Sequence, residues 1–169
     1  MFNVAPCPIP NTTFLEDLTH REGNYTDCFV TAISEDVSIS EFISAFFGSP
    51  VLRLERRLLA LISARSTAAD VAAVANGTGT KIALWTVDQR DETQIILKAA
   101  SGGIRTWMMV SRTSEETTRL YFGSALVPEA SENGEIKLRF STRALMGFHK
   151  LYSRIVLWSA KTQLHEMRR

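Results

Sequence analysis

LMGFHKLYSRIVLW, at residues 145–158, is the stretch that decides the fold. Its apolar side chains recur about every 3.6 residues, and residues 142–165 contain no proline. We therefore predict one long C-terminal helix over about 142–165. A stripe this wide has to be buried by the rest of the chain. It consists of Leu145, Phe148, Leu151, Tyr152, Ile155, Val156 and Trp158.

Alternating segments ahead of this helix predict the surface on which it packs. Segments near 81–90, 93–100, 104–112 and 117–127 contain β-branched and aromatic residues and are separated by short turn-like stretches. Asn133-Gly134 indicates a further hairpin, which joins a strand ending near Pro128 to one at 135–140. Such short connections favour an antiparallel meander, because parallel strands need long crossovers.

The first half of the chain predicts an arm, a strand and a group of helices. Residues 1–24, with three prolines, suit an extended arm followed by surface structure. YTDCFVTAI at 25–33 alternates and predicts a first strand. Helical patterns follow, from near Glu41 to a stop at 48–50, then to near Ser66, then over 67–75 with Thr67 as a cap; Ser38 or Ser40 can cap the first of them. The sequence therefore predicts one α+β domain over 25–169, with two or three helices inserted after the first strand.

Composition argues against several classes of function. The 169 residues, 45% of them hydrophobic, suit one compact domain. With 19 basic and 18 acidic side chains and no long Lys/Arg run, nucleic acid is disfavoured as a partner. The two cysteines, Cys7 and Cys28, and three widely spaced histidines predict no metal site, and no motif indicates a cofactor. The N-terminus lacks a signal-peptide pattern and no apolar run could span a membrane, so we expect a cytoplasmic protein.

The order of elements is similar to the helix-grip fold of the START-like (SRPBCC) superfamily, in which a curved antiparallel sheet wraps a C-terminal helix and encloses a cavity. More specifically, the chain resembles the bacterial domain-of-unknown-function family 2867. The stretches that carry this resemblance are YTDCF at 25–29 through LRLERRLLALI at 52–62, KIALWTVDQRDETQIIL at 81–97, LYFGSALVP at 120–128 and LMGFHKLYSRIVL at 145–157. In that family we expect an Asp/His/Arg cluster leading into the central strand, where SGGIR here keeps only Arg105. The resemblance implies a cavity and names no activity.

Candidate site residues follow from this architecture. A cavity bounded by strands 104–110 and 118–126 and the terminal helix would suit a mostly apolar ligand. Its predicted ligand-binding residues are Arg105, Trp107, Met109, Tyr121, Phe148, His149 and Tyr152. Two alternatives stay open. Arg105 could pair with an acid such as Asp88 or Glu92 at the sheet edge, and His149 could be a partly buried helix histidine bonded to a backbone carbonyl.

Three functions are compatible with this sequence. The first is a module that binds a small hydrophobic molecule. The second is a cyclase- or dehydratase-like enzyme that uses His149 or Arg105 as an acid/base or carbonyl polariser. The third is a homodimeric interaction module without a ligand, which pairs sheet edges or buries the Phe-rich first helix.

Overall fold

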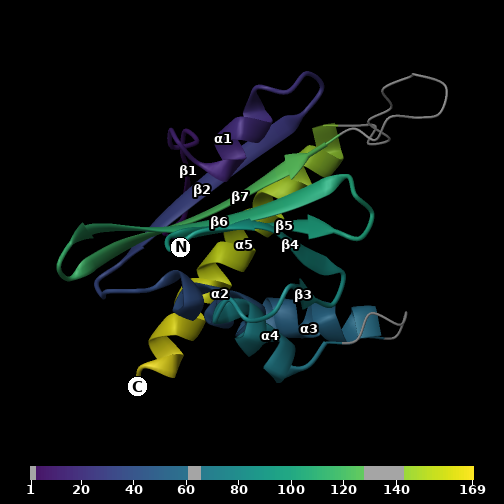
Figure 1. Cartoon of the computed structure of the whole chain (residues 1–169). Coiled ribbons are helices and arrows are strands. Elements are labelled where there is room, and N and C mark those ends of the chain that lie inside the picture. The colour runs from purple at the N-terminus through teal and green to yellow at the C-terminus, as the bar shows by residue number, and fades with distance from the viewer. Residues whose placement is uncertain (1–2, 61–65, 128–142) are drawn as a thin grey trace.

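The computed structural model describes residues 3–60, 66–127 and 143–169, and the side chains of 58–60 and 143–148 are outside the description. Seven strands of the described chain form one antiparallel sheet in the order β1-β2-β7-β6-β5-β4-β3 (Figure 1). Their bounds are β1 (Ala5–Pro6), β2 (Tyr25–Ile33), β3 (Lys81–Ile82), β4 (Trp85–Arg90), β5 (Gln94–Ala99), β6 (Ile104–Ser114) and β7 (Thr117–Leu126). The α+β class and the antiparallel meander are therefore confirmed.

One predicted strand is divided in two. The segment expected as a single strand over 81–90 forms β3 and β4, which pair with each other. The break is at Ala83, whose φ of 51° is in the left-handed region that a residue with a Cβ seldom adopts. A tight turn centred on an alanine has no sequence signal, so the alternation predicted one strand. The hairpin expected around Asn133-Gly134 lies outside the described residues.

The helices are α1 (Phe14–Thr19), α2 (Ile39–Gly48), α3 (Pro50–Ala60), α4 (Ala68–Ala75) and α5 (Arg143–Met167). Two or three helices were expected after the first strand and three are present, and the long terminal helix is confirmed. Predicted caps are also present, because Thr67 and Ser38, which was one of two candidates, each form a capping box with the acidic residue three positions later. None of the helices within the described ranges is long and apolar enough to cross a lipid bilayer.

The sheet separates two apolar layers. Helices α2, α3, α4 and α5 lie on one side of the sheet and α1 on the other (Figure 1). The larger layer contains Phe29, Met108 and Phe122 from the sheet together with Val156 from α5. Its Phe-rich helix α2 is itself buried, with Phe42, Phe46 and Phe47 at most 3% exposed, so those side chains are not on the surface as a dimer contact would require.

The N-terminal segment covers the second side of the sheet. Strand β1 pairs with β2, and α1 packs its Leu15 and Leu18 onto Trp107 and Tyr121. This close approach requires a glycine at 123 in β7, where a Cβ would contact Leu15 and lie 2.7 Å from a backbone oxygen of β2. The segment expected as an arm with surface structure is therefore a structural layer of the fold.

Candidate functional site

A cavity of about 530 Å³ lies between the helix-facing side of the sheet and helices α2, α3 and α5. This volume is typical of small-molecule sites. Most of the lining is apolar, and the polar side chains come from α3, β6, β7 and α5. The apolar lining consists of Phe46, Phe47, Val51, Leu52, Leu54, Trp85, Ile104 and Phe122, and the polar lining of Glu55, Thr106, Ser124, His149 and Tyr152.

Strand alternation decides which sheet residues reach this cavity. Successive side chains of a strand point to opposite faces, so Thr106 on β6 and Phe122 and Ser124 on β7 face the helices. Phe122 stacks on Phe46 of α2 with ring centroids 5.3 Å apart, which closes the wall on that side. The aromatic wall is thus built by core packing between one strand and one helix.

Three polar residues from different elements meet beside the cavity. Asp27 on β2 accepts hydrogen bonds at Oδ1 from the Ser124 backbone N–H (3.1 Å) and from the Ser124 hydroxyl (2.7 Å). His149 on α5 places Nε2 2.7 Å from the Ser124 oxygen and 3.3 Å from Asp27 Oδ2. The Asp27 side chain is 7% exposed and that of His149 29% exposed, so a buried carboxylate supports a half-buried imidazole.

This network assigns the protons of the cluster. The Ser124 hydroxyl has one hydrogen, which it donates to Asp27, so its oxygen accepts from His149 Nε2. Nε2 therefore carries a proton, and in the neutral imidazole Nδ1 holds a lone pair. Nδ1 makes no hydrogen bond to another described residue. The cluster consequently leaves His149 Nδ1 as a hydrogen-bond acceptor.

The cluster is not a nucleophilic triad. In such a triad the carboxylate holds one imidazole nitrogen and the serine hydroxyl meets the other. Here Ser124 and Asp27 both face Nε2, and the serine hydrogen is directed to the carboxylate. The imidazole cannot take a proton from Ser124 through the nitrogen that already carries one.

A second polar pair lies in the cavity wall. The Tyr152 hydroxyl on α5 donates a short hydrogen bond to the Glu55 carboxylate on α3. Burial, together with the hydrogen bond and the negative charge of Glu55, raises the pKa of Tyr152 far above that of a free phenol. Tyr152 therefore stays protonated at physiological pH and remains a donor committed to Glu55.

The structure divides the predicted site residues between the two faces of the sheet. His149 and Tyr152 line the cavity, whereas Trp107, Met109 and Tyr121 pack on the α1 side and do not reach it.

Arg105 does not line the cavity either. It pairs with Asp88 (3.2 Å) and donates to the Gly102 carbonyl, as the alternative reading expected. Phe148 belongs to α5, but its side chain lies outside the described residues.

Sequence reasoning missed Asp27, Ser124, Glu55 and Thr106. One signal was available for Asp27, because it shares a strand face with Phe29 and Ile33, and a carboxylate on a core face is uncommon unless it is paired. The wrong face of β6 was chosen because both of its faces are apolar, and alternation alone does not say which one meets the helices.

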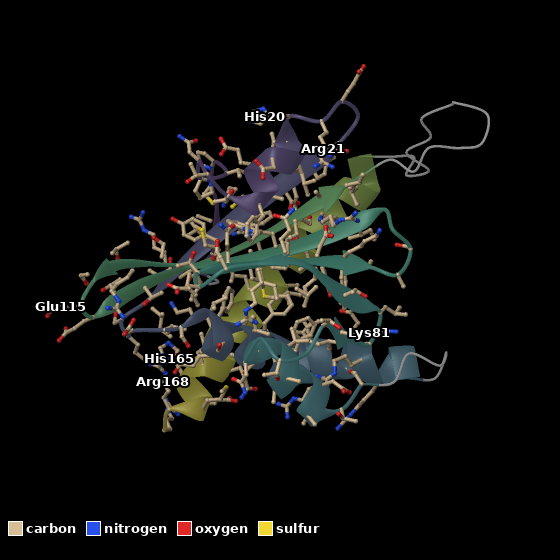
Figure 2. All side chains as sticks on the ribbon, viewed as in Figure 1. His20, Arg21, Lys81, Glu115, His165 and Arg168 are labelled. Carbon is tan, nitrogen blue, oxygen red and sulfur yellow. The ribbon has the colours of Figure 1, made fainter. Side chains whose placement is uncertain are left out.

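The other two histidines are far from this site. His165, for example, lies near Arg168 at the C-terminal end of α5 (Figure 2). Both side chains contact Glu35.

Comparisons with known proteins give no functional assignment. No family model matches the sequence, and no curated protein matches it. A solved structure, that of a conserved protein of unknown function from Enterococcus faecalis, is similar with a TM-score of 0.41 and 8% sequence identity. The match covers 82% of this chain and 71% of that one.

Proposed function

We propose that this protein binds a small, mainly apolar molecule in the cavity between the sheet and α5. The observation that supports it is the combination of an aromatic and aliphatic wall with a few convergent polar groups in a volume of about 530 Å³. Known ligand sites have this composition, in which apolar area supplies affinity and a few polar atoms fix orientation.

The proposal includes a fold assignment to the helix-grip class. Its support is the element order and the placement of α5, which packs across β2 and β7, the second and third strands from one edge of the antiparallel sheet. In that class the space between sheet and terminal helix is the binding site, and the support from this chain is that its cavity is lined by residues of the sheet and of α5. The resemblance to family 2867 remains a proposal of the same kind.

A cavity-filling variant tests the binding proposal. Val51 lines the cavity from α3, so Val51→Trp places an indole in it, whereas Leu151→Trp adds the same group at a 50% exposed position outside the lining. We expect freshly purified wild-type protein and the Leu151 variant to carry a small-molecule adduct in native mass spectrometry, or to bind Nile red. The Val51 variant should lose both. Equal binding by the two variants, or none by the wild type, would refute the proposal.

The pairing of His149 with Asp27 favours an enzyme as the second candidate. A carboxylate that fixes one imidazole nitrogen leaves the other free to abstract a proton from a carbon next to a carbonyl. Arg105 has no part in this candidate, because it pairs with Asp88 away from the cavity.

Proton exchange tests this candidate without a known substrate. In D₂O the base would remove an α-proton of 1-tetralone and return deuterium, which NMR detects. Faster exchange with wild-type protein than with His149→Gln is expected if the protein is an enzyme of this type. Equal rates would exclude His149 as a base and leave simple binding.

A further inference from the structure

The polar groups of the cavity have a hydrogen-bond balance that restricts the ligand. Both Ser124 donors go to Asp27 Oδ1, the His149 Nε2 proton goes to the Ser124 oxygen, and the Tyr152 hydroxyl goes to Glu55. The donors of these residues are therefore all used. What these residues can offer a ligand is therefore hydrogen-bond acceptors and not donors.

Two acceptors without a hydrogen bond lie at the end of the cavity formed by Ser124 and His149, one on His149 in the lining and one on Asp27 directly behind it. Asp27 Oδ2 is buried and makes no hydrogen bond, although its distance of 3.3 Å from His149 Nε2 is within ion-pair range. His149 Nδ1 also has no hydrogen-bond partner among the described residues. A buried acceptor without a hydrogen bond, such as Asp27 Oδ2, is rare in native proteins, and a bound donor is one way to satisfy it. The Thr106 hydroxyl, which lines the same cavity, can donate or accept.

Charge leads to the same conclusion. The described lining contains Glu55 and no Lys or Arg, and Asp27 lies directly behind Ser124. An anionic head group would meet two carboxylates in a partly desolvated site, where like charges repel more strongly than in water. A neutral donor would not meet this repulsion, and a cation would be attracted.

We propose that the ligand has an apolar body and a hydrogen-bond-donating head, a hydroxyl or an ammonium group, that lies at the cluster of Asp27, Ser124 and His149. This inference rests on the proposed binding function. It excludes fatty acids and other carboxylates as the preferred ligand class.

Four probes of one shape separate these chemistries. They are 2-methylnaphthalene, 2-naphthalenemethanol, 2-naphthalenemethylamine and 2-naphthoate, each titrated into the wild-type protein by calorimetry. One net neutral hydrogen bond corresponds to about a tenfold gain in affinity. The alcohol and the amine should therefore bind about tenfold more tightly than the methyl compound, and the carboxylate more weakly than the alcohol by about the same factor.

A conservative variant tests whether Asp27 causes the preference for the alcohol over the carboxylate. Asp27→Asn removes the negative charge and adds a donor, so the preference for the alcohol over the carboxylate should shrink about tenfold, while affinity for 2-methylnaphthalene stays the same. Asp88→Asn is the control, because it removes a carboxylate that pairs with Arg105 outside the cavity lining and should leave the ranking unchanged. The ranking with wild-type protein tests the inference even if the Asp27 variant does not fold.

The possible outcomes separate the two proposals. Binding of none of the four probes would refute the binding function itself. Binding of all four with the carboxylate as the tightest, or with the methyl compound equal to the alcohol and the amine, would leave that function in place and overturn the assignment of a donor head group.

Discussion

Replacing Gln94 with leucine should destabilise the fold without affecting the cavity. The Gln94 side chain is 6% exposed, and its Oε1 accepts from the indole N–H of Trp107 (2.9 Å) and from the backbone N–H of Phe14 (3.1 Å). One amide oxygen thus satisfies a fully buried tryptophan and holds the first turn of α1 against the sheet. Leucine has a similar volume and accepts no hydrogen bond.

The expected loss follows from the two donors left without a partner. An orphaned buried donor costs about 1–3 kcal/mol. The Trp107 indole is 0% exposed and should suffer the full cost, whereas the partly buried Phe14 N–H can recover some of it from water. We therefore expect Gln94→Leu to lower the free energy of unfolding by about 2–4 kcal/mol. For a chain of this length the loss corresponds to a fall in Tm of about 5–15 °C.

Urea denaturation followed by far-UV circular dichroism measures this loss. Gln89→Leu is the matched control, because Gln89 is exposed on the neighbouring strand and its replacement should change stability by less than about 0.5 kcal/mol. The Trp107→Phe variant has no indole donor. Gln94→Leu should therefore lower the free energy of unfolding less in this variant than in the wild type, with a coupling energy of about 1 kcal/mol or more. A single Gln94→Leu variant as stable as the control, or additive effects in the double variant, would refute the reasoning.

Three further outcomes are expected. Gly123→Ala should destabilise by about 1–3 kcal/mol in urea melts, because its Cβ has no room; Gly48→Ala, where a Cβ meets nothing within 4 Å, should be neutral or stabilising, and equal effects would contradict the packing argument. The thiols of Cys7 and Cys28 lie 3.2 Å apart, so diamide should join them with loss of both thiol hydrogens in the intact mass and about 3 kcal/mol of added stability, whereas recovery of two free thiols would contradict this. Hydrogen bonds from the Thr67 backbone and hydroxyl in the capping box of α4 lower the pKa of Asp70 below 3.8. Ionised Asp70 therefore stabilises α4 at neutral pH, and this stabilisation is lost as pH falls through the lowered pKa. An NMR titration midpoint at or above 3.8 would contradict this.

Local patterns were sufficient for most of the secondary structure. The strand at 25–33, the caps at Ser38 and Thr67 and the meander after residue 81 were all predicted from spacing and side-chain type. These features depend on residues within a few positions of each other, because strand alternation, capping and helical periodicity are properties of short segments. The turn at Ala83 was missed because no residue near it in the sequence distinguishes this alanine from a strand residue.

The candidate site could be predicted only in part. His149 and Tyr152 were found because they lie on the apolar stripe of a long helix, and that stripe had to be buried. In the sequence, Asp27 is 122 residues before its partner His149, and Glu55 is 97 residues before its partner Tyr152. No local pattern relates residues so far apart. Trp107 and Tyr121 were assigned to the cavity because their strands are apolar on both faces.

The sequence by itself determined that this chain is an α+β protein with an antiparallel sheet and one long terminal helix to be packed against it. Only the tertiary structure decided which side of the sheet that helix covers, that α1 covers the other side, and that Asp27, Ser124 and His149 meet beside a cavity. The physical reason is that periodicity shows a face is to be buried without showing against which element, whereas a site depends on contacts between elements far apart in the chain.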